Sequence, residues 1–372
     1  MVIPPIFHPS RFAFLLVAAA MAALPFHPAV AVEEVNVPEG ETYLLDAIQS
    51  TGGAKHINLS GGTLQLVSGT DATFAIAGVN ANKSNGIATI EIATANATPR
   101  TLTLSGTLSI GTYTTVQVNS ANHSTLVLPC VATTQSGPAL KPGNTDVAVG
   151  TMWGNITLDG TTTGNTLGVF TGSTLQKQNT GTWTLTGDNS DQTWNAAING
   201  GNFVVKQGAA PSPGSISVES IFSPEAGTSV RGRLSLRNGA TLNLADGKIG
   251  TFSVGVLDGP NGGTETVKFD VTDSGVDHLI IGNVSDSNSI KGRVVLNPLT
   301  KRLTPGTYQL VTLTAKGRTL MEHHFAFDFT GPPADHNNMV MTQTANGYTF
   351  TLAPVEENGA WTGLTLTISA AP

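Results

Sequence analysis

The chain of 372 residues has little charge, few aromatic side chains and one cysteine. Charged residues make up 12% of the sequence, against the usual quarter, and aromatic residues make up 6%. The single cysteine, Cys130, excludes an intramolecular disulfide, so the fold has to be stabilised by a large buried core. The formal net charge is −7 and no cluster of Lys and Arg occurs, so nucleic acid and anionic membranes are not expected partners.

Helical periodicity is also nearly absent. Its best candidate is Glu41–Ser50 (ETYLLDAIQS), where apolar residues follow helical spacing and Gly52-Gly53 ends the pattern. We therefore expect one short helix in an N-terminal cap, residues 32–55. Beyond residue 31, no apolar run reaches the roughly 20 residues that a membrane-spanning helix needs.

The N-terminal segment has the three parts of a secretory signal. A short region with Arg11 precedes an apolar run, Phe12–Phe26, and Ala29-Val30-Ala31 supplies the small-x-small cleavage pattern. We predict that residues 1–31 are a cleaved signal peptide. The remaining chain is then a soluble protein that is secreted or held at the cell surface.

Glycine, threonine and asparagine are abundant, with 42 Gly in the chain. Short segments alternate apolar and hydroxyl residues between turn residues, as in Gly62–Leu66, Gly106–Ile110 and Gly239–Leu244. Thr, Val and Ile favour strands, whereas Gly and Asn favour turns with positive φ. The sequence therefore predicts an all-β fold of many short strands.

Two architectures use such strands, a β-sandwich and a parallel β-helix. The β-helix is favoured for residues 56–265, because the strands are short and closely spaced and because charged residues are scarce along most of residues 56–200. Outward Thr, Asn and Gln can stack in uncharged ladders, whereas stacked like charges would repel each other.

The most specific stretch is Leu175–Val205, which resembles the autotransporter-associated β-strand repeat. The family pattern has a Leu and a Lys, then Gly-Thr-apolar-Thr-Leu-Thr-Gly, an Asn-rich turn and Gly-Gly-x-apolar-x-Val. The matching residues are Leu175, Lys177, Gly181, Thr182, Trp183, Thr184, Leu185, Thr186, Gly187, Asn189, Trp194, Ile198, Gly200, Gly201, Phe203 and Val205.

This resemblance implies a right-handed parallel β-helix in which Trp183, Leu185, Trp194 and Ile198 point into the coil and Gly187-Asp188-Asn189 turn a corner. It also implies an exported bacterial surface protein that is a structural scaffold or an adhesin. Surface glycans or other surface proteins are the implied partners, with no cofactor and no catalysis. The chain departs from the family because residues 266–372 are too short for a membrane β-barrel, so we expect no barrel in this chain.

Residues 266–372 form a C-terminal β region with longer strands and more charge. Val267–Ile281, Val294–Leu313, Tyr348–Leu352 and Leu364–Ile368 read as strands. They either continue the coil or form a sandwich-like element that covers its end, and the longer strands favour a distinct element.

Some parallel β-helices are polysaccharide lyases or hydrolases, so catalysis and glycan binding are the alternatives to a scaffold. Asn144-Thr145-Asp146 matches one part of the polygalacturonase acid set, but no Asp-Asp pair, Gly-His-Gly or Arg-Ile-Lys follows. The sequence predicts no catalytic residue.

Two clusters raise the question of a metal ion. Asp270, Asp273 and Asp277 could offer oxygen ligands to Ca²⁺, but their spacing fits a solvated acidic turn better. Adjacent histidines on a strand, His323 and His324, point to opposite faces, and a Gly-Pro-Pro loop separates them from His336. We therefore predict no metal-binding and no cofactor-binding residue.

Overall fold

The computed structural model describes residues 32–50, 55–83, 85–92, 100–111, 114–120, 124–134, 155–171, 174–189, 194–209, 214–259, 264–284, 291–315, 320, 324–329 and 339–371. All of them belong to the second of two compact units, Met1–Ala31 and Val32–Pro372. The predicted signal peptide, residues 1–31, lies outside the described residues. No helix in the described part of the chain is long and apolar enough to cross a membrane.

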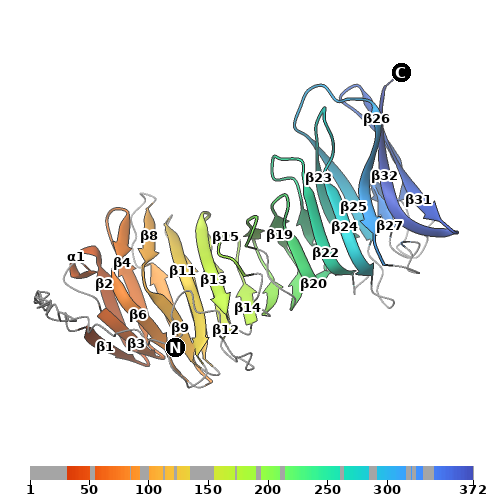
Figure 1. Ribbon diagram of the computed structural model, residues 1–372. Coiled ribbons are helices and arrows are strands. Elements are labelled where there is room, and N and C mark those ends of the chain that lie inside the picture. Colours follow the sequence, from red (N-terminus) through yellow and green to blue (C-terminus); the bar gives the residue numbers. More distant parts are fainter. Residues whose placement is uncertain are drawn as a thin grey trace, which may run out of the picture. The chain divides into compact units, whose positions relative to one another are not determined.

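Most described strands belong to two sheets that receive strands in alternation along the chain (Figure 1). The first sheet contains β1 (Glu33–Pro38), β3 (Lys55–Ser60), β5 (Ala72–Phe74), β6 (Ile76–Ala81), β8 (Thr101–Leu104), β9 (Thr107–Gly111), β11 (Thr125–Thr134), β13 (Asn165–Thr171), β15 (Thr182–Leu185), β17 (Asn202–Val205), β19 (Ile221–Pro224), β21 (Thr241–Asn243), β23 (Thr264–Val271), β25 (Lys291–Pro298) and β27 (His324–Ala326).

The second sheet contains β2 (Thr42–Asp46), β4 (Thr63–Val67), β7 (Ile87–Ile92), β10 (Thr115–Ser120), β12 (Asn155–Gly160), β14 (Thr174–Lys177), β16 (Asn195–Ile198), β18 (Ser215–Val218), β20 (Ser229–Leu236), β22 (Thr251–Asp258), β24 (His278–Val284), β26 (Gly306–Leu313), β30 (Thr342–Ala345), β31 (Tyr348–Glu357) and β32 (Ala360–Ala370). A short antiparallel pair, β28 (Asp328–Phe329) and β29 (Met339–Val340), stands apart from both sheets.

Strands of one sheet pair in parallel with the strand of the preceding and the following rung, where a rung is one strand from each sheet. In the family-like repeat, β15 pairs with β13 and β17, while β14 pairs with β12 and β16. The same parallel pairing runs from β1 to β27 and from β2 to β26. The chain is therefore an all-β parallel β-helix, and the fold-class prediction is confirmed.

The stacking runs on past residue 265, because β23 to β27 extend the same two sheets. The last strands then change direction. Strand β32 pairs antiparallel with β26, and β31 and β30 follow as antiparallel neighbours. The turns on either side of β31 are Asn-Gly pairs with positive φ at both residues, which suits two-residue hairpins.

The predicted helix over Glu41–Ser50 is mostly wrong. Only Ala47–Ser50 is helical (α1), and Thr42–Asp46 is strand β2, which pairs with β4. Leu45 is fully buried while Leu44 is 53% exposed, so adjacent residues alternate in burial. Backbone pairing with the next rung outweighs a local helical pattern that is too short to be stable alone.

Two of the long C-terminal segments that read as strands are each interrupted. Val267–Ile281 spans the end of β23 and the start of β24, with a turn between them at Asp273-Ser274. Val294–Leu313 spans β25 and β26, with the connection at residues 299–305. Each segment therefore crosses from one sheet to the other.

The core lies between the two sheets and is filled by inward columns of apolar side chains. In the first sheet, residues in register from rung to rung are Trp183, Phe203, Phe222, Leu242, Val267 and Val294. All of them are at least 98% buried. Period-2 alternation places one face of each strand in this core, as expected from the sequence.

The residues predicted to build the repeat around Trp183 lie where they were expected. Trp183, Leu185, Trp194 and Ile198 are buried. Asn189 fills the corner after β15, since its Oδ1 accepts from the Phe170 amide at 2.8 Å. The corner asparagine is thus a buried hydrogen-bonding partner of the preceding rung.

Candidate functional site

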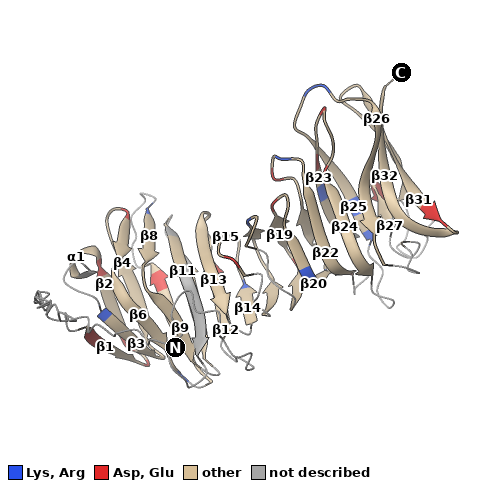
Figure 2. Ribbon diagram, in the orientation of Figure 1, with Lys and Arg blue, Asp and Glu red and all other residues tan. Residues whose placement is uncertain are grey.

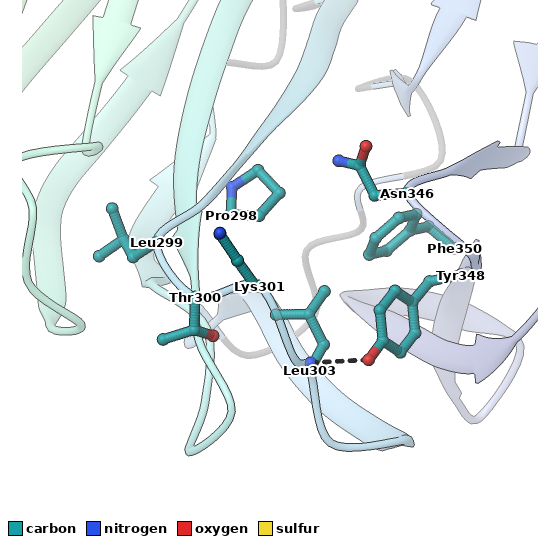
Figure 3. A pocket seen from close by; sticks show the side chains of 8 residues that line it. All are labelled: Pro298, Leu299, Thr300, Lys301, Leu303, Asn346, Tyr348 and Phe350. Carbon is teal, nitrogen blue, oxygen red and sulfur yellow. Dashed lines mark hydrogen bonds between the residues drawn. The ribbon is translucent and has the colours of Figure 1, made fainter.

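A cavity of about 380 Å³ lies between the β25–β26 connection and the hairpin of β30 and β31 (Figure 3). Such a volume falls at the lower end of the range of small-molecule sites. The connection and the end of β25 form one wall and the hairpin forms the other. The described lining residues are Pro298, Leu299, Thr300, Lys301, Leu303, Asn346, Tyr348 and Phe350.

One hydrogen bond joins the two walls of the cavity, and two more order the β25–β26 connection. The Leu303 amide donates to Tyr348 Oη at 2.9 Å, which joins the connection to the hairpin (Figure 3). Tyr308 Oη donates to the Thr304 carbonyl at 2.8 Å, and Thr300 Oγ1 donates to the Arg302 carbonyl at 2.9 Å. The cavity is therefore shaped by the folded chain before any ligand arrives.

The rim of this cavity is polar and positively charged. Lys301 and Asn346 are exposed, and no acidic residue occurs among the described lining residues. Lys301 and Arg302 are the one pair of adjacent basic residues in the sequence. Neither takes part in an ion pair within the described part of the chain.

The aspartates considered for Ca²⁺ are not among the described lining residues of this cavity, and they do not form a solvated turn. Asp270 is fully buried and Asp277 is 2% exposed, whereas Asp273 is exposed. Asp277 accepts from the amides of Gly250, at 2.9 Å, and Asp270, at 2.6 Å. The solvated-turn interpretation is therefore wrong for two of the three residues, because their carboxylates are needed to pair corner amides.

The same arrangement recurs in neighbouring rungs. Asp270 Oδ2 accepts from the Gly247 amide at 2.7 Å, and Asp246 Oδ2 accepts from the Ala226 amide at 2.9 Å. No group of His, Cys, Asp and Glu in the described ranges is arranged to hold a metal ion. These carboxylates are parts of the corners of the coil.

Two buried acids in this region have perturbed pKa values. Burial raises the pKa of Asp277 to about 7, and the negative charges of Asp270 and Asp246 add to the rise against the effect of its two amide donors. Burial likewise raises the pKa of Glu265, which faces the core from β23, to about 7. Both groups are costly to ionise where they lie.

Lys177, the lysine of the family-like repeat, also points into the coil. It stands in register between Leu158 and Ile198 and is fully buried. Its Nζ donates to the carbonyls of Gln178, Asn179 and Gly200, the last two at 3.0 Å. Burial lowers the pKa of Lys177 to about 8, opposed by the charge of Asp159.

An uncharged row, which we call the neutral ladder, follows one register position of the second sheet. Most of its members are partly exposed, whereas Thr157 and Ser235 are buried. Its members are in register over nine successive strands, and none of them is charged. They are Thr42, Thr63, Thr89, Gln117, Thr157, Gln176, Ala197, Ser217 and Ser235. Figure 2 shows how sparse charged residues are along these strands.

Several residues considered from the sequence lie outside the described residues. They are Asn144-Thr145-Asp146, His323 and His336, together with the side chains of Cys130 and His324. The cavity itself was missed, since its walls are joined by Leu303 and Tyr348, which are distant in sequence. The adjacent basic residues Lys301 and Arg302 are the sequence feature that could have pointed to this site.

No family model and no curated protein matches this chain. Among solved structures, the Haemophilus influenzae Hap adhesin matches over 90% of this chain, with a TM-score of 0.39 and 12% sequence identity. The match covers 33% of that adhesin chain, so this chain corresponds to about a third of its length.

Proposed function

We propose that this protein is an exported, adhesin-like β-helical scaffold of a bacterial cell surface or secretome, which binds other surfaces without catalysis. The observation that carries the proposal is that ionisable and uncharged polar groups lie in different places in the coil. Buried ionisable groups such as Asp270, Asp277 and Lys177 bond to the backbone at corners. The exposed and partly exposed members of the neutral ladder, Thr42, Thr63, Thr89 and Ser217, offer hydroxyl groups for contacts with partners.

The buried acids also disfavour the alternative of a polysaccharide-cleaving enzyme. A hydrolase needs two carboxyl groups that face a substrate across a cleft. Asp246, Asp270 and Asp277 instead accept hydrogen bonds from backbone amides. Their oxygens are oriented toward the chain itself.

The partners that suit such a surface are surface glycans or surface proteins. Neutral hydroxyl and amide side chains exchange hydrogen bonds with sugar hydroxyls and with exposed peptide groups without the cost of stripping water from charges. The export signal predicted at residues 1–31 would deliver the scaffold to where such partners occur.

The test is an attachment assay combined with a search for cleavage. Beads coated with the purified protein are expected to attach to bacterial or host cells more than beads coated with heat-denatured protein. A parallel assay for reducing ends on a panel of polysaccharides is expected to show no release. Sugar release would establish the enzymatic alternative, and equal attachment of both bead types would refute the adhesive function.

A further inference from the structure

We infer that the cavity between the β25–β26 connection and the β30–β31 hairpin binds a carboxylated sugar residue of a glycan. The inference deepens the proposed adhesive function, on which it rests for its biological use, by assigning a ligand class and a site. It follows from the shape, the charge and the hydrogen-bonding groups of the cavity.

The shape of the cavity suits a small ligand. The volume of about 380 Å³ admits a small ligand rather than a folded domain. The bond from the Leu303 amide to Tyr348 Oη fixes one wall against the other, so little ordering is needed on binding. Leu299, which is 39% exposed, and Pro298 offer an apolar wall that suits the C–H face of a sugar ring.

The positive charge at the cavity favours an anionic ligand. Lys301 lines the cavity, and no acidic residue is found among the lining residues that the structure describes. Arg302, the next residue, is not among the lining residues that the structure describes. In a protein with a net charge of −7, this local excess of positive charge favours an anionic group.

The remaining polar groups select a sugar over a simple carboxylate. Asn346 can both donate and accept hydrogen bonds, and its positive φ of 54° holds it at the tip of the hairpin. Thr300, on the opposite wall, adds a hydroxyl oxygen that can accept a hydrogen bond, since its proton is donated to the Arg302 carbonyl. Ring hydroxyls need such paired donors and acceptors, which an aliphatic acid would leave unsatisfied.

The experiment measures the binding of four small probes to the full chain by calorimetry and saturation-transfer NMR. Methyl glucuronide and N-acetylneuraminic acid are the carboxylated sugars, methyl glucoside is the neutral sugar, and acetate is the acid without a ring. We expect at least one carboxylated sugar to bind, with methyl glucoside and acetate each at least tenfold weaker.

The matched variants are Lys301→Gln and Arg302→Gln. Both remove one positive charge from the same connection, but only Lys301 lines the cavity. Lys301→Gln is expected to weaken binding of the carboxylated sugar at least tenfold, because it removes a charge-assisted hydrogen bond. Arg302→Gln is expected to change it by no more than about twofold.

Three results would overturn the inference: no binding of either carboxylated sugar, equally tight binding of methyl glucoside or acetate, or equal effects of the two variants. The bead assay separates this from the proposed function. Attachment without probe binding would refute the sugar site alone. Probe binding without attachment to any cell would refute the adhesive function and leave the site intact.

Discussion

At the scale of single residues, Lys177 shows why a charged side chain is found among the apolar columns. Its ammonium group joins carbonyls of two successive rungs, Asn179 in one and Gly200 in the next. A neutral side chain of similar length would fill the same space but would leave these acceptors without a donor. The presence of a lysine at this position of the repeat is therefore explained by its hydrogen bonds to the corner carbonyls.

Lys177→Met is expected to lower the free energy of unfolding by about 2 kcal/mol, since buried carbonyls lose their partner. Urea denaturation followed by tryptophan fluorescence measures this. Gln176→Met, on the outward face of the same strand, is the control and is expected to change stability by less than about 0.5 kcal/mol. Equal stability of Lys177→Met and wild type would mean that water replaces the ammonium group.

Glu265 makes the stability of the protein depend on pH. Its pKa in the fold, about 7, lies above its ordinary value of 4.5, so the folded protein keeps a proton that the unfolded chain has released. The free energy of unfolding therefore falls as the pH rises from about 4.5 to 7, and the loss is complete above the folded pKa. Asp277 acts in the same direction.

The amide of Gln mimics the protonated acid. In Glu265→Gln, the fall in the free energy of unfolding between pH 4 and 8 is therefore expected to be smaller than in the wild type by about 3 kcal/mol. Urea midpoints at a series of pH values between 4 and 8 measure the effect. Glu219→Gln, at an exposed acid, is the control and should leave the pH profile unchanged. A wild-type profile that rises over this range would contradict the assignment.

At the scale of elements, each strand has an inward and an outward face, and the repeat around β15 tests which face is which. Trp183 faces the core and donates from Nε1 to the Asp159 carbonyl at 3.1 Å. Thr184, the next residue, faces outward in register with Thr166 and Val204.

Trp183→Asp is expected to abolish cooperative folding, because it buries an unpaired charge and removes a large core side chain. Thr184→Asp, one residue away, should cost less than about 1 kcal/mol. Circular dichroism during thermal melting compares the two. If Trp183→Asp melts at the temperature of the wild type, the assigned register of β15 is incorrect.

The strands, the inward tryptophans and the corner Asn189 could be predicted because they depend on local alternation. Strand β2 could not, since its pairing with β4 overrides a helical pattern that is visible in the sequence alone. The burial of Asp270 and Asp277 was missed for a related reason. Their amide donors, Gly247 and Gly250, belong to a turn whose position depends on how the rungs stack.

At the scale of the whole molecule, the described chain from residue 32 onward is a stack in which each rung bonds mainly to its two neighbours. The first strands, β1 and β2, each pair with a single strand of their sheets, β3 and β4. At the other end, β32 covers the last parallel strand of the second sheet, β26, with antiparallel pairing. The two ends are therefore protected unequally.

Hydrogen exchange of the full chain is expected to reflect this difference. Amides of β15 to β22 should exchange slowest, because they lie between paired rungs with the large aromatic residues of the core. Amides of β1 and β2 should exchange fastest among the strands, and those of β26 and β32 at an intermediate rate. Uniform protection along the chain would show that the coil opens only as a whole.

The neutral ladder has a consequence for the surroundings in which the protein can work. Attraction between opposite charges weakens as dissolved ions screen it, whereas contacts between hydroxyl and amide groups carry no net charge to screen. The ion pairs among the described residues fall in two groups, one within residues 33–83 and the other within residues 206–328. The middle rungs are joined by backbone pairing, so we expect the stability of this part of the stack to change little between low and high salt.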